Sequence, residues 1–350
     1  MVADRASVSR SNSGSDSHRD NSSSPIPAAA IVADDEATDD DGYHEPSDGS
    51  SNASTSMASS VRDYNFENRR RYHKFKEGRY MLPNDDMEQD REDMKHAMLV
   101  HVCEGALHNA PLVNPQKILD IGTGTGIRAM DTDITGLDLS PIQPACVPSN
   151  VHFVVDDVEA DWLYPDDSID YIHVRNMAPA LKDWPRLLAQ AYNRALKPGG
   201  WIEMQDMVWA FASDDGTVGP DYTPKKTVDL LREAFDKFGV DLDAADRFGD
   251  RIDAAGFVNQ IHDVEKVPVG TWPKEPRLKS VGSYCAAVNY DSLGGVTNVP
   301  FTKCLGWTQL EIEIFLIQVR KDLLDNSNHA YHWYHSYSGQ KPLEVESSTS

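Results

Sequence analysis

The sequence predicts an α/β fold built on a doubly wound, mostly parallel sheet, and three observations lead to this prediction. Residues 117–121, K-I-L-D-I, form a short apolar run of the kind expected for a buried central strand. Three glycines at alternate positions, Gly122, Gly124 and Gly126, follow this run directly. Further short apolar runs alternate with amphipathic helical patterns along the chain, as is typical of parallel sheets covered by helices.

The glycine-rich turn predicts a nucleotide-type ligand. Glycine lets the backbone turn sharply and lets a ligand approach it without an intervening Cβ. A strand that runs into such a turn places it at the carboxyl edge of the sheet, where open α/β sheets bind nucleotides. A dinucleotide fingerprint needs its third glycine three residues after the second, but Gly126 follows Gly124 after one residue, and no G-x-x-x-x-G-K-[ST] phosphate loop is present. This spacing disfavours a nicotinamide dehydrogenase, while other nucleotide binders or a plain turn stay open.

Two strand ends carry carboxylates that suit a nucleoside. Asp138 ends the second strand, where it can accept hydrogen bonds from both vicinal hydroxyls of a ribose. Asp157 follows the third strand and is placed to accept the adenine amino group, while Val158 packs against the ring. With 117–121, the expected strands make a seven-stranded sheet, the others being 134–139, 151–155, 169–174, 201–204, 257–267 and 329–337.

The remaining parts of the folded region are predicted to be mainly helical. In the leader, residues 61–110, the segment Pro83-Asn84-Asp85-Asp86 offers a turn and an N-cap for a helix ahead of the first strand. Residues 268–326 are mostly helical in pattern, with a break at Gly294-Gly295. This insertion lies between the last two strands, so we expect it to cover the carboxyl edge of the sheet as a substrate lid.

Composition divides the chain into one folded domain and two tails. The N-terminal tail is rich in Ser, Asp and Ala with almost no aromatic residues, so it is predicted to be disordered. Its serines and acidic residues suit a regulated or partner-binding tail, and a simple solvating extension is the alternative. The predicted boundaries are 1–60 for this acidic tail, 61–342 for the domain (leader 61–110, sheet core 117–267, helical lid 268–326, last strand 327–342) and 343–350 for a disordered C-terminal tail.

Bulk composition excludes several classes of function. The net charge of −23 argues against direct binding to a nucleic-acid backbone. The four cysteines form no C-x-x-C pair, which excludes a zinc site recognisable from sequence and a disulfide scaffold, so no metal is expected. No apolar run reaches the length of a membrane span, and no signal-peptide core is present. We therefore expect an intracellular protein without a membrane partner, either cytoplasmic or nuclear.

Several motifs together resemble one family, the fungal LaeA-like methyltransferases, a class I group that depends on S-adenosylmethionine (SAM). The resemblance spans roughly residues 64–342 and is far more specific than the glycine turn alone. The motifs that carry it are Y-N-F-E-N-R-R-R-Y-H (64–73), Y-M-L-P-N-D (80–85), L-D-I-G-T-G-T-G-I (119–127), D-L-S-P-I-Q-P (138–144), D-D-V-E (156–159), K-D-W-P (182–185), L-K-P-G-G-W (196–201), L-G-W (305–307) and G-Q-K-P (339–342).

The resemblance implies a Rossmann-like class I fold, SAM as the cofactor and a role in fungal secondary metabolism. Family members either tailor small metabolites or act as nuclear regulators, so the methyl acceptor is expected to be a small molecule or a regulatory protein. The motifs assign no catalytic residue. The residues expected to bind the cofactor are Asp120, Gly122, Thr123, Gly124, Gly126, Asp138, Asp157 and Val158.

Two features depart from the family pattern. Arg69 stands where the family usually has glycine, and only residues 127–132 separate Gly126 from the second strand. A crossover between parallel strands needs on the order of a dozen residues including its helix, so we interpret the short segment as an internal deletion of about ten residues. This favours a second hypothesis, a non-catalytic regulatory subunit that uses the acidic tail as its contact. The intact Asp138 and Asp157 favour an enzyme.

Three residues expected near the carboxyl edge of the sheet, His173, Tyr72 and His73, are candidate proton acceptors, and each also has a structural interpretation. His173 lies within a predicted strand and is interpreted as a packed, hydrogen-bonded core residue. Tyr72 and His73 are interpreted as closing over the cofactor.

Overall fold

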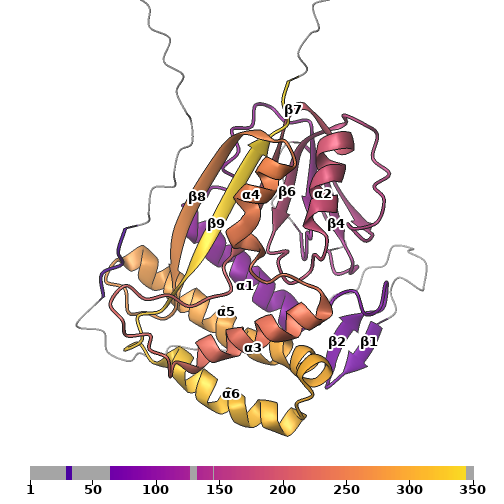
Figure 1. Ribbon diagram of the computed structural model, residues 1–350. Helices are drawn as coiled ribbons and strands as arrows, with labels where there is room; N and C mark the ends of the chain where they lie inside the picture. Colours follow the sequence, from indigo (N-terminus) through magenta and orange to yellow (C-terminus); the bar gives the residue numbers. More distant parts are fainter. Residues whose placement is uncertain (1–28, 34–63, 127–131, 145, 344–350) are drawn as a thin grey trace, which may run out of the picture.

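A computed structural model of the chain describes residues 29–33, 64–126, 132–144 and 146–343 (Figure 1). Its centre is a seven-stranded sheet in the order β5-β4-β3-β6-β7-β9-β8. The strands β3 to β7 pair with one another in parallel, whereas β9 is antiparallel to both β7 and β8. This confirms the predicted class of fold. The strands are β3 Lys117–Ile121, β4 Asp133–Asp138, β5 Val151–Val155, β6 Ile169–Arg175, β7 Leu196–Met207, β8 Val258–Pro268 and β9 Tyr331–Gln340.

The central strands β3 and β6 are buried on both faces, which explains why their sequences are mostly apolar. The prediction of 201–204 for the fifth strand is too short, because β7 continues to Met207. Gln205 and Asp206 made the end of this strand look like a loop, yet both side chains are buried and hydrogen-bonded.

Helices cover one face of the sheet and its carboxyl edge. The helices α2 and α4 pack on the face around Ile172 and Ile202. Figure 1 shows α3, α5 and α6 gathered at the end toward which the parallel strands run, and these helices share one apolar core with α1. The helical insertion before the last strand is therefore confirmed. The helices are α1 Asp86–Val102, α2 Trp184–Gln190, α3 Thr223–Phe238, α4 Phe248–Ala254, α5 Pro276–Pro300 and α6 Gln309–Leu324, with short helical turns η1 Ala191–Ala195, η2 Ala244–Arg247 and η3 Phe301–Leu305.

The predicted N-cap of the leader helix is confirmed. Asp85 caps α1, since its carboxylate accepts the backbone N–H of Glu88 at 3.1 Å. Gly239 ends α3 in a left-handed conformation, with φ 82°.

The leader begins with a strand pair rather than a helix, so that part of the prediction is wrong. The strands β1 (Tyr64–Glu67) and β2 (Arg70–His73) form an antiparallel hairpin. Its two turn residues, Asn68 and Arg69, have φ of 50° and 63°. Positive φ at both central positions favours Asn-Gly, which gives a physical reason for glycine at position 69 in the family pattern.

The predicted break at Gly294-Gly295 is also wrong, because α5 passes through both residues. A Cβ at Gly295 would lie 3.3 Å from a carboxylate oxygen of Glu88 and from Pro83. The glycine therefore serves close packing of α5 against the start of α1 rather than interruption of the helix.

Part of the predicted N-terminal tail contacts the domain. Ala33 forms an isolated antiparallel bridge with Pro273, and the backbone N–H of Lys274 donates to the carbonyl of Val32 at 2.8 Å. Residues 1–28, 34–63 and 344–350 lie outside the described residues, so the predicted tail boundaries stay a prediction.

The short crossover also lies mostly outside the described residues, which leave out 127–131. The strands that it joins are nevertheless parallel neighbours, with Ile118 opposite Ile134 and Ile121 opposite Leu137. Asp138 therefore ends its strand beside the glycine turn, as predicted from the strand order.

Within the described ranges, no helix is both long enough and apolar enough to cross a membrane. In the same part of the chain, no group of His, Cys, Asp and Glu side chains is arranged to hold a metal ion.

Candidate functional site

The glycine turn borders an open cleft at the carboxyl edge of the sheet, which we call the glycine-loop cleft. Gly122, Gly124 and Gly126 all have positive φ, at 71°, 58° and 128°. The backbone N–H groups of Gly122 and Thr123 donate to the carbonyl of Leu137, at 2.8 and 3.2 Å. A Cβ built at Gly124 would meet no protein atom within 4 Å. The middle of the turn therefore presents bare backbone to open space.

Asp138 is hydrogen-bonded into the same turn. One carboxylate oxygen accepts the backbone N–H of Gly124 and the other accepts that of Ser140, both at 2.9 Å. Desolvation in the cleft wall raises the pKa of Asp138 to about 6, and the nearby charge of Asp120 adds to this rise. The carboxylate is fixed at the rim of the cleft and, when ionised, keeps lone pairs for hydroxyl donors.

The predicted adenine end of the cleft is formed by Asp157 and Val158. Val158 is buried, and Asp157 accepts the backbone N–H of Glu159 at 3.0 Å. Arg79 of the leader lies against this end, with Nε 3.5 Å from a carboxylate oxygen of Asp157 and a second ion pair to Glu159. A basic side chain from far along the chain thus contacts the carboxylate expected to bind adenine.

Two other predicted residues have different surroundings. Asp120 is buried, does not line the cleft and contacts His173, whose Nδ1 lies 2.7 Å from its carboxylate. This agrees with the interpretation of His173 as a packed core residue. Thr123 does line the cleft, and its buried hydroxyl has no hydrogen-bond partner among the described residues. The hydroxyl oxygen lies 2.8 Å from the position that a Cβ would take at Gly136, so it is enclosed by protein rather than open to the cleft.

The leader contributes cleft residues that sequence reasoning missed. Tyr80, Asn84 and Gln89 line the glycine-loop cleft opposite the glycine turn. Asn84 Nδ2 donates to the hydroxyl of Ser140 at 3.1 Å, which ties the leader to the loop after β4. The motif Y-M-L-P-N-D in the leader was visible in the sequence, but it did not indicate that its side chains face the cleft.

The expectation that Tyr72 and His73 close over the cofactor finds no support. Both side chains are buried, and neither lines a described cavity. Burial raises the pKa of Tyr72 to about 12 and lowers that of His73.

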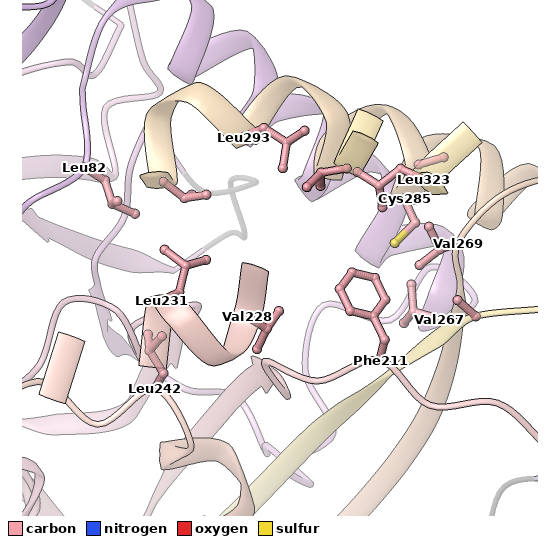
Figure 2. Packing of buried hydrophobic residues seen from close by; sticks show 14 of the residues in the cluster. Leu82, Phe211, Val228, Leu231, Leu242, Val267, Val269, Cys285, Leu293 and Leu323 are labelled. Carbon is pink, nitrogen blue, oxygen red and sulfur yellow. The ribbon is translucent and has the colours of Figure 1, made fainter. Parts of the chain in front are cut away.

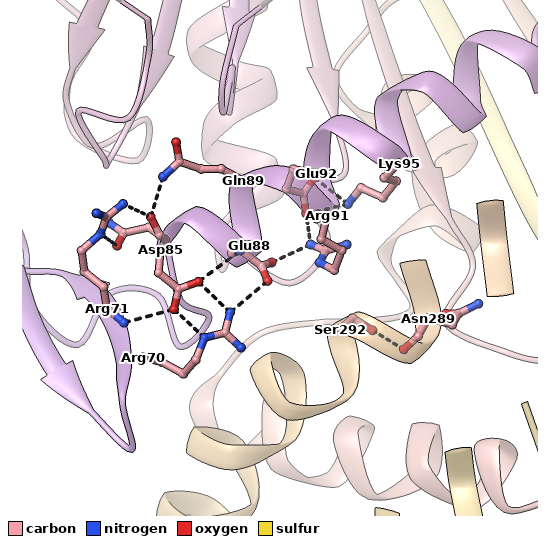
Figure 3. Close-up of polar contacts among 11 residues, drawn as sticks. Arg70, Arg71, Asp85, Glu88, Gln89, Arg91, Glu92, Lys95, Asn289 and Ser292 are labelled. Atoms are coloured by element: carbon pink, nitrogen blue, oxygen red, sulfur yellow. Dashed lines mark hydrogen bonds and ion pairs between the residues drawn. The ribbon is translucent and has the colours of Figure 1, made fainter. Parts of the chain in front are cut away.

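Charged residues hold the β1–β2 hairpin against the start of α1 (Figure 3). Arg70 of the hairpin donates to the capping carboxylate of Asp85 at 2.9 Å and lies 3.6 Å from Glu88. Within α1, Arg91 pairs with Glu88 at 2.5 Å and also with Glu92. This chain of ion pairs fixes the hairpin and the first turns of α1 beside the cleft.

A second cavity, which we call the helical cavity, lies between the carboxyl edge of the sheet and the helices α1, α3, α5 and α6. Its empty volume, open mouth included, is about 960 Å³, against about 1230 Å³ for the glycine-loop cleft. Tyr80, Glu92 and Asn176 line both spaces, so the two adjoin. Most of its wall is apolar, and Figure 2 shows several of these side chains directed toward one another from different elements, among them Leu82, Phe211, Val228, Leu231, Leu293 and Leu323.

Several polar side chains interrupt this apolar wall, among them His332, Asn289 and Asp206. The ring Nδ1 of His332 lies 2.8 Å from the carbonyl of Ala210 and its Nε2 lies 3.2 Å from Asn289 Nδ2. A carbonyl only accepts, so Nδ1 carries the proton, and Nε2 of the neutral ring accepts from Asn289. Burial lowers the pKa of His332 to about 4, so the ring is neutral at pH 7.

Asp206 is the third of these side chains. Its carboxyl group accepts the backbone N–H groups of Ala178 and Met207, at 2.8 and 2.9 Å. Burial raises the pKa of Asp206 to about 7, so near neutral pH both the neutral and the ionised form of this cavity residue are populated.

Comparison with known proteins identifies the family. A family model described as a methyltransferase domain matches residues 91–259. The chain is 42% identical over 306 residues to methyltransferase pytC of Aspergillus terreus, covering 85% of this chain and 94% of that protein. It is 34% identical over 292 residues to secondary metabolism regulator LAE1 of Cochliobolus heterostrophus, covering 79% and 95%. It is 29% identical to protein-methionine methyltransferase laeA of Emericella nidulans, covering 79% and 76%.

The site fits the cofactor of this family. Open backbone at Gly124 and the carboxylate of Asp138 in the wall of the same cleft are features that a SAM nucleoside and its amino-acid part require. The chain therefore belongs to the fungal LaeA-like family of class I, SAM-dependent methyltransferases.

Proposed function

We propose that this methyltransferase acts on a small, largely apolar metabolite that binds in the helical cavity, with SAM in the glycine-loop cleft. The observation that carries the proposal is the arrangement of the two spaces. They adjoin at Tyr80, Glu92 and Asn176, one is lined by polar backbone and carboxylates, and the other is mostly apolar. A donor and an acceptor held in adjoining spaces satisfy the alignment that methyl transfer requires.

On the donor side, each predicted residue receives a role. The backbone of the turn at Gly122, Thr123, Gly124 and Gly126 faces the amino-acid part and the sugar, and Asp138 accepts from the ribose hydroxyls. Asp157 and Val158 bind the adenine, and Asp120 supports the turn from beneath through His173. When bound, SAM supplies an electrophilic methyl group on its sulfonium.

On the acceptor side, the wall favours an apolar body with one hydrogen-bonding group. Burying apolar ligand surface against Val228, Leu231 and Leu293 contributes about 25 cal/mol per Å². The lone pair on Nε2 of His332, which accepts from Asn289, is available to an acceptor hydroxyl or amine that displaces this amide. The chain's residues align the acceptor and exclude water, and a base is needed only if the reacting atom carries a proton.

A regulatory subunit without catalysis is the second candidate. The observation that favours it is the relationship to LAE1, which is named a secondary metabolism regulator. In that case SAM binding would be weak or absent, and the acidic N-terminal tail would be the contact with a regulatory protein.

The test is methyl transfer from radiolabelled SAM to two acceptor pools. One pool contains small aromatic alcohols, amines and carboxylic acids, and the other contains fungal cell protein including methionine-rich peptides. We expect label in the solvent-extractable small molecules. Label only in precipitated protein would refute the small-molecule acceptor, and absence of both SAM binding and transfer would favour the regulatory subunit.

A pair of variants on α3 locates the acceptor. Val228→Phe fills the helical cavity from its wall, so it should abolish transfer while SAM affinity stays unchanged. Asp229→Phe is the matched control, because the neighbouring side chain is 73% exposed on the outer side of the same helix. Equal activity of the two variants would place the acceptor elsewhere.

A further inference from the structure

The helix α6 has two apolar faces, and only one of them is covered. Its inner face, Ile312, Leu316, Val319 and Leu323, is buried in the helical core. Its outer face carries large aliphatic side chains in contact with solvent, and Figure 1 shows α6 as the outermost helix at that end of the molecule. We call these residues the outer stripe; they are Leu310 (69% exposed), Ile314 (59%), Ile317 (66%) and Leu324 (59%).

The spacing of the outer stripe is that of a helix-pairing seam. Its members follow one another at intervals of four, three and seven residues, which is the alternation of a and d positions in a heptad. Lys321 occupies the remaining seam position between Ile317 and Leu324. Contiguous exposed apolar residues of this kind on a soluble protein mark an interaction surface. The same amino-acid types scattered singly would need no explanation.

We propose that the outer stripe pairs with the outer stripe of a second copy of this chain, with the two α6 helices antiparallel. Charges beside the stripe favour this occupant. Glu311 and Glu313 lie toward the N-terminal end, and Arg320 and Lys321 lie toward the C-terminal end, next to Asp322. Within one helix Arg320 is 3.6 Å from Glu313, and in an antiparallel pair it can contact the Glu313 of the other copy instead. An antiparallel two-fold pair places each acidic end beside the basic end of the other copy, whereas a parallel pair would place like charges together.

The chain's own tail is a poorer occupant. Residues 1–60 have almost no aromatic residues and few large aliphatic ones, so they offer little apolar surface to cover the stripe. A second α6 offers four aliphatic side chains of the same kind.

Pairing would also affect the helical cavity. Val319 and Leu323 on the inner face of α6 line that cavity, while the outer stripe lies on the opposite side of the same helix. A second copy would therefore hold one wall of the cavity in place from outside.

The first test is sedimentation of the full chain at about 1 to about 100 μM, since an interface of one helix pair is at the small end of the range and implies micromolar affinity. We expect a monomer–dimer equilibrium that Ile317→Glu shifts by at least tenfold toward monomer. Leu163→Glu is the control, because Leu163 is 91% exposed outside α6 and its substitution should leave the equilibrium unchanged. A monomer at every concentration, or a dimer equally strong in Ile317→Glu, overturns the proposal. SAM affinity measured on each variant shows that it is folded.

Cysteine cross-linking tests the orientation. With the exposed Cys146 replaced by Ser, Ile317→Cys should form an intermolecular disulfide, because residue 317 is midway between Leu310 and Leu324. Leu310→Cys alone should not cross-link, but a mixture of Leu310→Cys and Leu324→Cys should. Cross-linking of Leu310→Cys with itself overturns the antiparallel arrangement.

Discussion

The substitution Gly124→Val separates a binding defect from a folding defect. Gly124 has φ 58°, and a Cβ there meets no protein atom within 4 Å. The cost to the fold is therefore the strain of a side chain in the left-handed region, about 1–2 kcal/mol and somewhat more for a β-branched residue. Stabilities of about 5–15 kcal/mol absorb this, so the variant stays folded with a melting temperature lower by several degrees.

The same side chain occupies the space in which the ligand would touch the turn. We expect SAM affinity to fall by more than a hundredfold, roughly 3 kcal/mol, by the usual conversion of affinity to free energy. Calorimetry and a thermal melt on one sample measure both quantities. Gly105→Val is the control, because Gly105 has φ 88° and equally open surroundings away from the cleft. If Gly124→Val binds SAM as tightly as Gly105→Val does, the assignment of the glycine turn to the cofactor is wrong.

Further predictions concern the carboxylates, the hairpin and the tail. SAM affinity should be full well above pH 6 and should decline as the pH falls through about 6, because protonation of Asp138, whose pKa is raised to about 6, removes the acceptor. Asp138→Ala should weaken SAM binding by about 1–3 kcal/mol and flatten this pH profile, as calorimetry across pH will show. Asp157→Ala should weaken SAM less in the same assay, because that carboxylate is already engaged in an ion pair; an equal or larger loss would reverse the ranking. Arg69→Gly should raise the free energy of unfolding by about 1 kcal/mol, and with it the melting temperature, since φ at this position is 63°. A lower melting temperature would count against the strained turn. Deletion of residues 1–28 should change neither melting nor SAM affinity, whereas deletion of 1–60 removes the bridge to the domain and should lower melting slightly with SAM affinity unchanged.

The sheet was predictable because its signals are local. The strands β3 and β6 are short apolar runs that burial on both faces imposes, and α3 ends at a glycine with positive φ. The hairpin β1–β2 was missed because its turn, Asn68-Arg69, lacks the glycine that marks such turns. The extension of β7 was missed because buried polar residues such as Gln205 look like loop residues until their partners are known.

Within the candidate site, the sequence could predict only those residues that lie at the carboxyl end of a single strand. The glycine turn and Asp138 follow from the rule that ligands bind at the carboxyl ends of parallel strands. Arg79 reaches Asp157 across the fold, and no local pattern indicates that contact. The helical cavity is formed by α1, α3, α5 and α6 together, so its existence depends on long-range packing. Asp120 was misplaced at the cleft because the sequence does not show that His173 pairs with it.

The central claim is that the donor lies in the glycine-loop cleft with its sulfur directed toward the helical cavity. A crystal structure of the full chain with S-adenosylhomocysteine tests it most directly. We predict ribose hydroxyls on Asp138, adenine beside Val158 and the sulfur at the junction lined by Tyr80 and Asn176. A bound nucleoside elsewhere, or a sulfur directed away from that junction, would contradict the account.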